Sequence, residues 1–148
     1  MSVILDLGEI KKILKDKKFL IFDFDGVLVD SVAIKGDVFA EIYEPYGKKI
    51  SDLVRNHHLS NGGMSRYEKF RLYHKNYLNL ILSEDELNQI CEFFSSLVKA
   101  KVIDANEILG ANAFLKNVNL EGKFCFLNSA TPVNELREIV HQRGCSHY

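Results

Sequence analysis

Two aspartates, Asp23 and Asp25, follow the short apolar run 19–22 directly and are separated by a single residue. While a chain stays extended, residues two apart lie on the same side of it, so both carboxylates are expected to face one way. Carboxylates this close repel each other, so either a cation neutralises them or one holds a proton near neutral pH. With Mg²⁺, one carboxylate can serve as ligand and as nucleophile toward phosphorus while the other transfers a proton. The alternative is an acidic turn that ends a strand.

The elements that must position these carboxylates can also be predicted. The run 19–22 (Phe-Leu-Ile-Phe) is typical of a strand buried on both faces of a parallel sheet. Gly26 then allows a sharp turn away from that strand. Open α/β sheets bind their ligands beyond the carboxyl ends of their strands, so we expect Asp23 and Asp25 to lie in a binding site.

Residues 22–31 (Phe-Asp-Phe-Asp-Gly-Val-Leu-Val-Asp-Ser) resemble the first signature motif of the haloacid dehalogenase superfamily. Most members are Mg²⁺-dependent phosphatases, although some are dehalogenases or mutases with Asp at the same place. The resemblance implies that Asp23 attacks the phosphoryl group to form an aspartyl-phosphate. It implies that Asp25 protonates the leaving group and then activates water. It also implies that Asp23 and the backbone carbonyl of Asp25 bind Mg²⁺.

A second apolar run, 124–127, ends in the polar sequence Asn-Ser-Ala-Thr-Pro. Thr131 is expected to be the N-cap of a helix and Pro132 its first residue. Phosphate oxygens can bind the free backbone N–H groups at such a helix start. The segment resembles the second superfamily motif, in which a Ser or Thr hydrogen-bonds the phosphoryl group. Here Asn128 stands at the aligned position and Ser129 follows it, and the sequence leaves open which one contacts phosphate.

Residues 32–103 have mainly helical periodicity, interrupted by a Gly-Gly turn. After that turn, one helix is expected to continue as far as Ile81, and a capping box formed by Ser83 and Glu86 predicts the next. The spaced aromatic residues of this block are expected in a core. The block resembles the all-helical cap that many superfamily members insert after the first motif.

The expected fold is therefore α/β, with a Rossmann-like core of parallel strands and an inserted helical cap. The predicted core is discontinuous, comprising 1–31 and 104–148, and the predicted cap is 32–103. The chain resembles most the branch that contains phosphoglycolate phosphatase and β-phosphoglucomutase. A small phosphorylated metabolite is the substrate that this resemblance implies.

Several cationic or titratable side chains flank the Gly-Gly turn of the predicted cap. Arg66 is a candidate for binding an anionic part of the substrate. The alternative places Arg66 and Lys69 on the surface of a helix N-terminus, and this alternative is favoured for Lys69. His57 and His58 lack the spacing of metal ligands and are expected to be partly exposed structural residues.

Composition narrows the class of protein. The chain has 148 residues, of which 47% are hydrophobic and 26% are charged, so it is expected to be globular. Its formal net charge of -1 provides no broad positive field for nucleic acid or an anionic membrane. There is no run of transmembrane length and no signal-peptide pattern. Cys91, Cys125 and Cys145 are widely spaced, as expected for reduced thiols in a cytoplasmic protein.

The third and fourth superfamily motifs, a Lys and an acidic group, would follow the second motif and its helix. The printed sequence stops at Tyr148, so the chain is expected to be truncated and weak or inactive as a phosphatase, without a Lys to balance the charge around Asp23. Its two predicted strands would have open edges, so self-association is expected. The alternative function is a non-catalytic or assembly-dependent remnant that acts as an interaction module.

Overall fold

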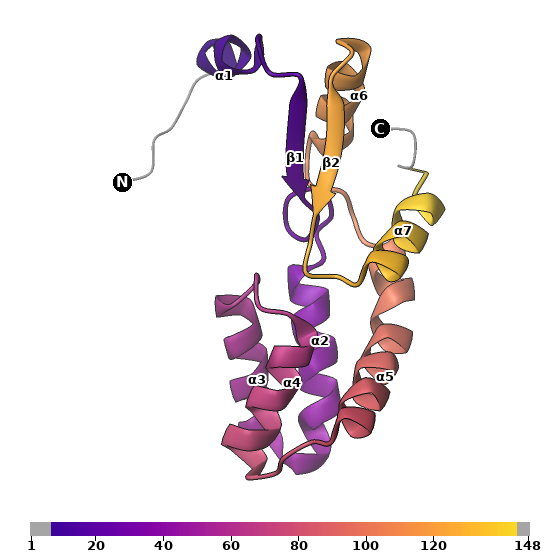
Figure 1. The fold of residues 1–148 in the computed structure, drawn as a ribbon. Coiled ribbons are helices and arrows are strands. Elements are labelled where there is room, and N and C mark those ends of the chain that lie inside the picture. The colour runs from indigo at the N-terminus through magenta and orange to yellow at the C-terminus, as the bar shows by residue number, and fades with distance from the viewer. Residues whose placement is uncertain (1–6, 145–148) are drawn as a thin grey trace.

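A computed structural model describes residues 7–144 and shows a short parallel sheet above a group of helices (Figure 1). The elements, in chain order, are α1 (Leu7–Leu14), β1 (Phe19–Asp23), α2 (Val32–Tyr43), η1 (Glu44–Tyr46), α3 (Lys48–Ser60), α4 (Arg66–Tyr73), η2 (His74–Leu78), α5 (Glu84–Ile103), α6 (Ala111–Leu120), β2 (Phe124–Asn128) and α7 (Val133–Gln142). η1 is a 3-10 helix and η2 is a π-helical turn.

The two strands are parallel neighbours, and the register pairs Phe19 with Phe124 and Asp23 with Asn128. Both strands therefore end at the same edge of the sheet, as the sequence predicts for a parallel core. The chain between them makes the helices that lie beyond this edge (Figure 1). Within residues 7–144, no helix has the length and apolar character needed to cross a lipid bilayer.

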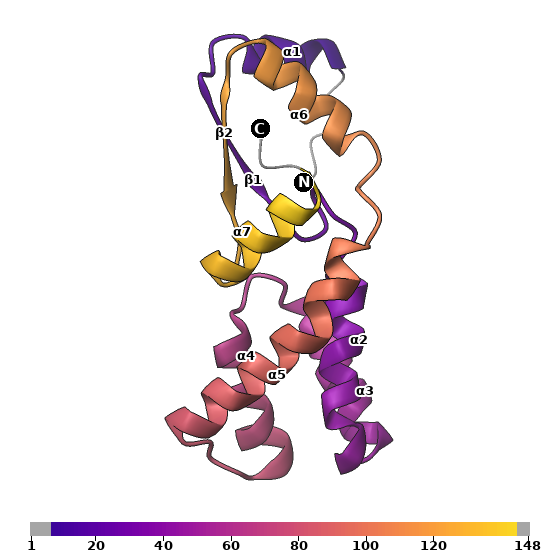
Figure 2. The same cartoon turned by 90° about the vertical axis from the view of Figure 1, so that its right-hand side faces the viewer.

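The sheet has one covered face and one open face. Helices α6 and α7 lie on the same side of the strands (Figure 2). On the other face, Phe19, Ile21, Phe124 and Phe126 are 63%, 71%, 60% and 51% exposed. The prediction that the strands are buried on both faces is therefore wrong for the described residues. Alternate side chains of a strand point to opposite faces, so a single layer of helices covers only half of them.

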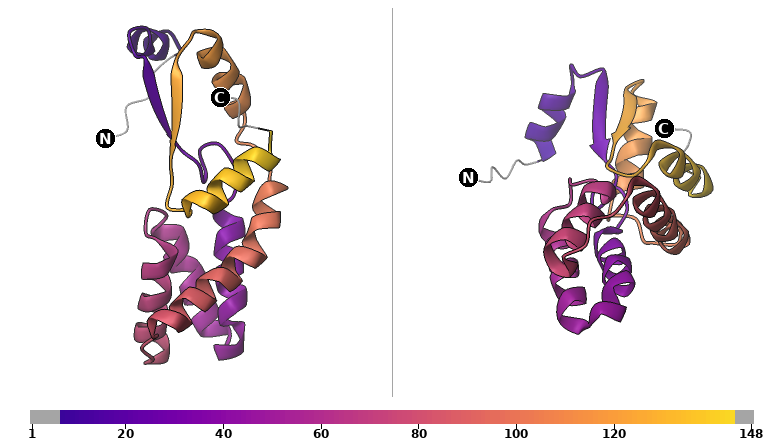
Figure 3. Two further views of the ribbon diagram at one scale, coloured as in Figure 1. Left: turned by 45° about the vertical axis from the view of Figure 1, so that its right-hand side comes forward. Right: turned by 60° about the horizontal axis from the view of Figure 1, so that its bottom comes forward.

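Helices α2, α3, α4 and α5 pack together around a core rich in aromatic rings (Figure 3). Phe39 is at its centre, with ring centroids 5.1 Å from Phe70 and 4.3 Å from Phe94. Tyr43 and Tyr73 are fully buried in the same cluster. The prediction that the spaced aromatic residues form a core is confirmed in part, because Phe93 and Tyr67 are 54% and 38% exposed. The division into a cap domain and a core domain stays a prediction.

The helix boundaries agree with the sequence in part. The capping box of Ser83 and Glu86 begins α5, which ends at Ile103, as predicted. The preceding helix is shorter than predicted, because it changes to the π-helical turn η2 and stops at Asn79, whose φ of 58° is left-handed. A residue in that conformation cannot continue a right-handed helix. Ile81 lies beyond the end and is 90% exposed.

Two long cationic side chains join helix ends to the rest of the fold. Lys123 donates hydrogen bonds to the carbonyls of Leu14 and Lys17 at the end of α1. Arg143 donates from one nitrogen to the carbonyls of Val102, Ile103 and Ala105 at the end of α5. Such contacts satisfy carbonyls that have no partner within their own helix. The second contact joins the end of α7 to the end of α5, and these two helices pack together (Figure 3).

Candidate active site

The turn after β1 is built around Gly26. Its φ is +75°, and its N–H donates a hydrogen bond of 2.7 Å to the carbonyl of Val29. A Cβ at this position would lie 2.9 Å from Cγ2 of Val32, closer than normal packing allows. The sharp departure that the sequence predicts at Gly26 is therefore confirmed. The turn brings the start of α2 back beside Asp25, which Ser31 and Lys35 contact.

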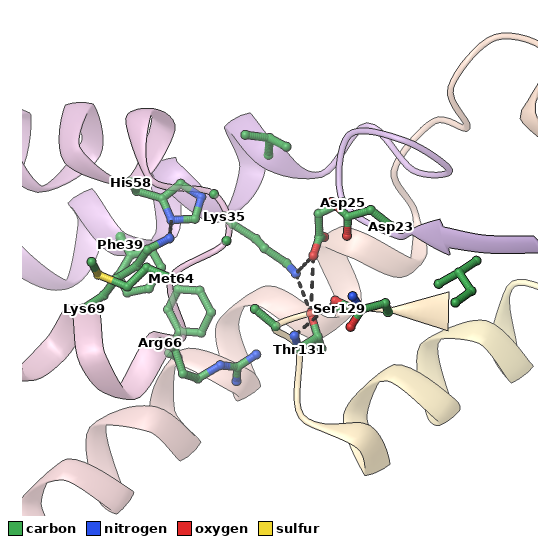
Figure 4. Close-up of a pocket in the computed structure, with 17 residues that line it drawn as sticks. Asp23, Asp25, Lys35, Phe39, His58, Met64, Arg66, Lys69, Ser129 and Thr131 are labelled. Carbon is green, nitrogen blue, oxygen red and sulfur yellow. Dashed lines mark hydrogen bonds and ion pairs between the residues drawn. The ribbon is translucent and has the colours of Figure 1, made fainter. Parts of the chain in front are cut away.

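Asp25 is held by polar groups from three segments. Its Oδ1 accepts a hydrogen bond of 2.5 Å from the hydroxyl of Ser31, and its Oδ2 forms an ion pair of 2.6 Å with Nζ of Lys35. Thr131, from the loop after β2, donates weakly to the same Oδ2 at 3.4 Å. Figure 4 shows the side chains of Lys35 and Thr131 converging on Asp25. The orientation of the Asp25 carboxylate is therefore fixed by both the motif and the second strand-end loop.

Asp23 is less enclosed than Asp25. Among the described residues, its carboxylate accepts one hydrogen bond, of 2.7 Å, from the N–H of Phe24. Asp23 pairs in register with Asn128, and both residues line a cavity of about 530 Å³ together with Asp25 and Ser129. The structure thus brings together the four residues that the sequence proposes for catalysis and phosphate binding. Which of Asn128 and Ser129 would contact phosphate stays open.

The loop after β2 differs from its predicted form by one residue. Helix α7 begins at Val133 with Pro132 as N-cap, so the prediction that Thr131 is the N-cap is wrong. The Thr131 side chain instead accepts a hydrogen bond of 2.8 Å from Lys35, while its N–H donates to Oγ of Ser129 at 3.1 Å. Ser129 accepts this bond through a lone pair, which leaves its O–H free to donate to another group.

Lys35 is a site residue that the sequence analysis missed. We expected no lysine near the aspartates, but Lys35 is only 7% exposed and pairs with Asp25. The reason is local, because α2 begins directly after the motif and its first turn brings Lys35 back over Asp25. One signal was present in the sequence. Lys35 precedes Val38 and Phe39 by three and four residues, so it shares their buried helix face.

Arg66 lines the same cavity, but its guanidinium is already paired. It forms two hydrogen bonds of 2.8 Å with the carboxylate of Glu135 in α7, and it also donates to the hydroxyl of Ser95. The Arg66 and Glu135 side chains are 6% and 9% exposed. Burial raises the pKa of Glu135, but the hydrogen bonds and charge of Arg66 outweigh it, so the net pKa is lowered.

The surface alternative for Arg66 and Lys69 is wrong, since Lys69 is 2% exposed. Its Nζ lies 3.0 Å from Nδ1 of His58, which is 5% exposed rather than partly exposed as predicted. His57 is half-buried, and its ring lies 3.0 Å from the hydroxyl of Tyr73. The sequence could not separate the two histidines, because the difference depends on which helix face meets α2 and α4.

The donor atoms suit a hard metal ion only in part. Within residues 7–144, no group of three or more His, Cys, Asp or Glu side chains is arranged to hold a metal. Mg²⁺, however, is commonly bound by one or two carboxylates together with water and substrate phosphate oxygens. Asp23 and Asp25 line one cavity and offer oxygen ligands of this kind. The residues therefore fit Mg²⁺ that is bound together with a phosphorylated substrate.

Comparison with known proteins supports the fold. No family model matches the sequence, and no curated protein is detectably similar to it. A crystal structure from Clostridium difficile named "Putative Phosphatase" is similar, with a TM-score of 0.56 and 14% identity over 89% of this chain. The fold is therefore mixed α/β, with a short parallel sheet and many helices, as in this similar structure. An L-2-haloacid dehalogenase from Xanthobacter autotrophicus gives a TM-score of 0.49 and 19% identity over 88% of this chain.

The chain spans only part of these structures. It covers 58% of the Clostridium difficile protein and 54% of the Xanthobacter autotrophicus enzyme. At such low identity the similarity shows the fold alone. Activity must therefore be argued from the residues of the site.

Proposed function

We propose that this chain carries the catalytic aspartates of a Mg²⁺-dependent phosphatase-type hydrolase that acts on a small phosphorylated metabolite. The observation that supports this most directly is the placement of Asp23, Asp25 and Ser129 around one cavity at the end of two parallel strands. In haloacid dehalogenase-like folds this edge also carries the start of the helical segment. Bound Mg²⁺ would neutralise charge between the carboxylates and the phosphoryl oxygens.

In this proposal Asp23 is the nucleophile. One of its carboxylate oxygens attacks phosphorus, the bond from phosphorus to the leaving oxygen breaks, and an aspartyl-phosphate forms. Asp25 gives a proton to the leaving oxygen. It then takes a proton from a water molecule that attacks the same phosphorus, which releases phosphate and restores the Asp23 carboxylate.

The remaining residues of the site would position these two groups. Ser31 and Lys35 hold the two oxygens of Asp25 and so fix the position of its side chain. One of these oxygens must first take up a proton before Asp25 can act as the acid. Lys35 also places a positive charge beside Asp25, in a site where the sequence predicted no lysine. Asn128 and Ser129 are proposed to donate hydrogen bonds to the phosphoryl oxygens.

The variant Asp23→Asn tests the proposal, because it removes the nucleophile and a metal ligand with little change in volume. We expect it to abolish Mg²⁺-dependent hydrolysis of p-nitrophenyl phosphate. Asp30→Asn is the matched control, since Asp30 lies in the same motif and is exposed. It should retain wild-type turnover. Activity in Asp23→Asn equal to that of the control would reject the assignment.

A binding experiment covers the case of slow turnover. Trifluoroberyllate adds to an aspartate carboxylate as an analogue of aspartyl-phosphate, and fluorine NMR detects the bound form. We expect a bound signal in the wild type and in Asp30→Asn, dependent on Mg²⁺, and none in Asp23→Asn. A wild-type chain with neither hydrolysis nor a bound signal would favour the interaction module instead. The branch of the superfamily is a further proposal that rests on the same resemblance, and the cytoplasmic location is one that rests on the widely spaced cysteines.

A further inference from the structure

Lys69 is a deeply buried cation for which residues 7–144 provide no acidic partner. Lys69 is only 2% exposed and lies in the wall of the cavity. Its Nζ is 3.0 Å from Nδ1 of His58 and 5.7 Å from the centre of the Phe39 ring. No carboxylate in this part of the chain forms an ion pair with it. Burial of an ammonium group without a counter-charge is costly, so its retention in a cavity wall requires an explanation.

The other cations of the cavity are already neutralised. Lys35 pairs with Asp25 at 2.6 Å, and Arg66 pairs with Glu135 at 2.8 Å. Both of these contacts join separate parts of the fold, so they have a structural role without any ligand. Lys69 makes no such connection to an acid among the described residues. An anion that enters the cavity would therefore meet an unpaired charge at Lys69.

The ionisation states of the pair agree with this. Burial and the charge of Lys35 lower the pKa of Lys69 to about 8, opposed by Asp25, so Lys69 is mostly charged at neutral pH. Burial, Lys69 and Lys35 lower the pKa of His58 to about 4, opposed by a hydrogen bond to the backbone of Val32 and by Asp25. His58 is thus neutral, and its Nδ1 accepts one hydrogen bond from Lys69. An ammonium has three donors, so two are left for other groups.

The position of the pair fits a ligand that also reaches the aspartates. Figure 4 shows Lys69 and His58 at one end of the drawn pocket and Asp23 and Ser129 at the other. The Lys35 side chain extends between the two ends. All of these residues line one cavity of about 530 Å³, a volume typical of small-molecule sites.

We propose that Lys69, oriented by His58, binds a second anionic group of the substrate, at the opposite end from the phosphoryl group that Asp23 attacks. This inference rests on the proposed phosphatase function and adds the substrate class, which is a small phosphate monoester with a further carboxylate or phosphate. The bound anion supplies the counter-charge that the fold does not. A substrate without the second anionic group leaves Lys69 buried and unpaired, so it is expected to bind more weakly.

Two ligands that differ only in this group test the inference. 3-Phosphoglycerate and glycerol 3-phosphate have the same length, and a carboxylate in the first replaces a hydroxymethyl group in the second. Calorimetric titration into Asp23→Asn with Mg²⁺ measures binding without turnover. We expect at least about tenfold tighter binding of 3-phosphoglycerate, as one charge-assisted hydrogen bond can provide.

Lys69→Met in the same background should bring the affinity ratio of the two ligands close to one. The substitution should weaken the binding of 3-phosphoglycerate and leave the affinity for glycerol 3-phosphate nearly unchanged. Lys75→Met is the matched control, since Lys75 is exposed in η2 and the substitution removes the same charge. It should preserve the ratio. Lys69→Met is also expected to unfold at the same temperature or higher, because it removes a buried charge.

Each outcome decides a different point. Equal affinities for the two ligands, or an equal loss of both in Lys69→Met, would overturn the second-anion site while the phosphate site stands. A preserved ratio in Lys69→Met would overturn it in the same way. If neither ligand binds and trifluoroberyllate also fails to bind the wild type, the proposed function fails and this inference fails with it.

Discussion

The helical part and the sheet of this chain differ in how completely they bury their aromatic residues. In α2, α4 and α5, Phe39, Phe70 and Phe94 are at most 2% exposed, whereas Phe19 and Phe124 of the strands are at least 60% exposed. The catalytic candidates lie where these two regions meet. This difference shows that aromatic packing within the described residues stabilises the helical end of the cavity. The sheet that carries Asp23 instead has an exposed apolar face, which is typical of a surface that contacts another part of a protein.

The largest expected effect on stability comes from replacing a phenylalanine by alanine, and it should differ between the helical part and the sheet. Phe70→Ala should reduce the free energy of unfolding by about 3–5 kcal/mol, because it leaves a cavity in a packed core. Phe19→Ala should cost less than about 1 kcal/mol, since that side chain is mostly in solvent. Urea unfolding of both variants measures the difference. Similar losses would mean that the strand face is covered in solution.

The next effect concerns the ion pair between the two regions. Arg66→Ala should cost about 3 kcal/mol or more, because it leaves the Glu135 carboxylate buried without its cation. The double variant Arg66→Met with Glu135→Leu should recover most of that loss, since it removes both charges and keeps the volume. Unfolding curves of the two variants test this. Equal destabilisation would show that the pair is needed for more than mutual neutralisation.

The same pair has a pH dependence of known sign. The folded-state pKa of Glu135 is lowered from its usual 4.5, so the pair stabilises the fold above about pH 4.5. That stabilisation is lost as the pH falls through the lower, folded-state value. The penalty for Arg66→Ala should therefore shrink on acidification, because a protonated Glu135 no longer needs a cation. Repeating the unfolding measurement between neutral and acidic pH is the check.

The smallest effect on stability, but a visible one on assembly, is expected at the open face of the sheet. We propose that the 148-residue chain self-associates through this apolar face or the strand edges beside it. Ile21→Lys should shift the population toward monomer, with little change in unfolding, since Ile21 is 71% exposed. Leu109→Lys is the control, because Leu109 is fully exposed away from the strands. Light scattering distinguishes these outcomes, and a wild-type monomer would contradict the proposal.

Much of the fold could be predicted from local sequence signals. The strand that ends at Asp23, the turn at Gly26 and the capping box at Ser83 depend on neighbouring residues, and all three are found as expected. The end of the helix before Ile81 was not predicted, because a π-helical turn and a left-handed Asn79 leave the apolar spacing unchanged. Periodicity reports which residues are apolar, and it does not report where backbone hydrogen bonding changes.

The site was predicted less completely, for a different reason. Asp23, Asp25, Asn128 and Ser129 could be placed together because parallel strands end at one edge. Lys35, Lys69 and Glu135 have roles that depend on how helices far apart in sequence pack. Arg66, for example, meets Glu135 across 69 residues of chain. A single sequence has no signal for such pairs unless a charged residue stands on an apolar helix face, as Lys35 does.

The parallel pairing of β1 with β2 also has a consequence for synthesis. Phe19 pairs with Phe124, so the first strand must wait for about 100 further residues before its neighbour leaves the ribosome. At typical rates of about 5–20 residues per second, that interval is roughly 5–20 seconds. During it the helices between the strands can form, while Phe19 and Ile21 stay without a partner strand. Chaperone dependence is therefore expected to be greatest before β2 (Phe124–Asn128) is available to pair with β1.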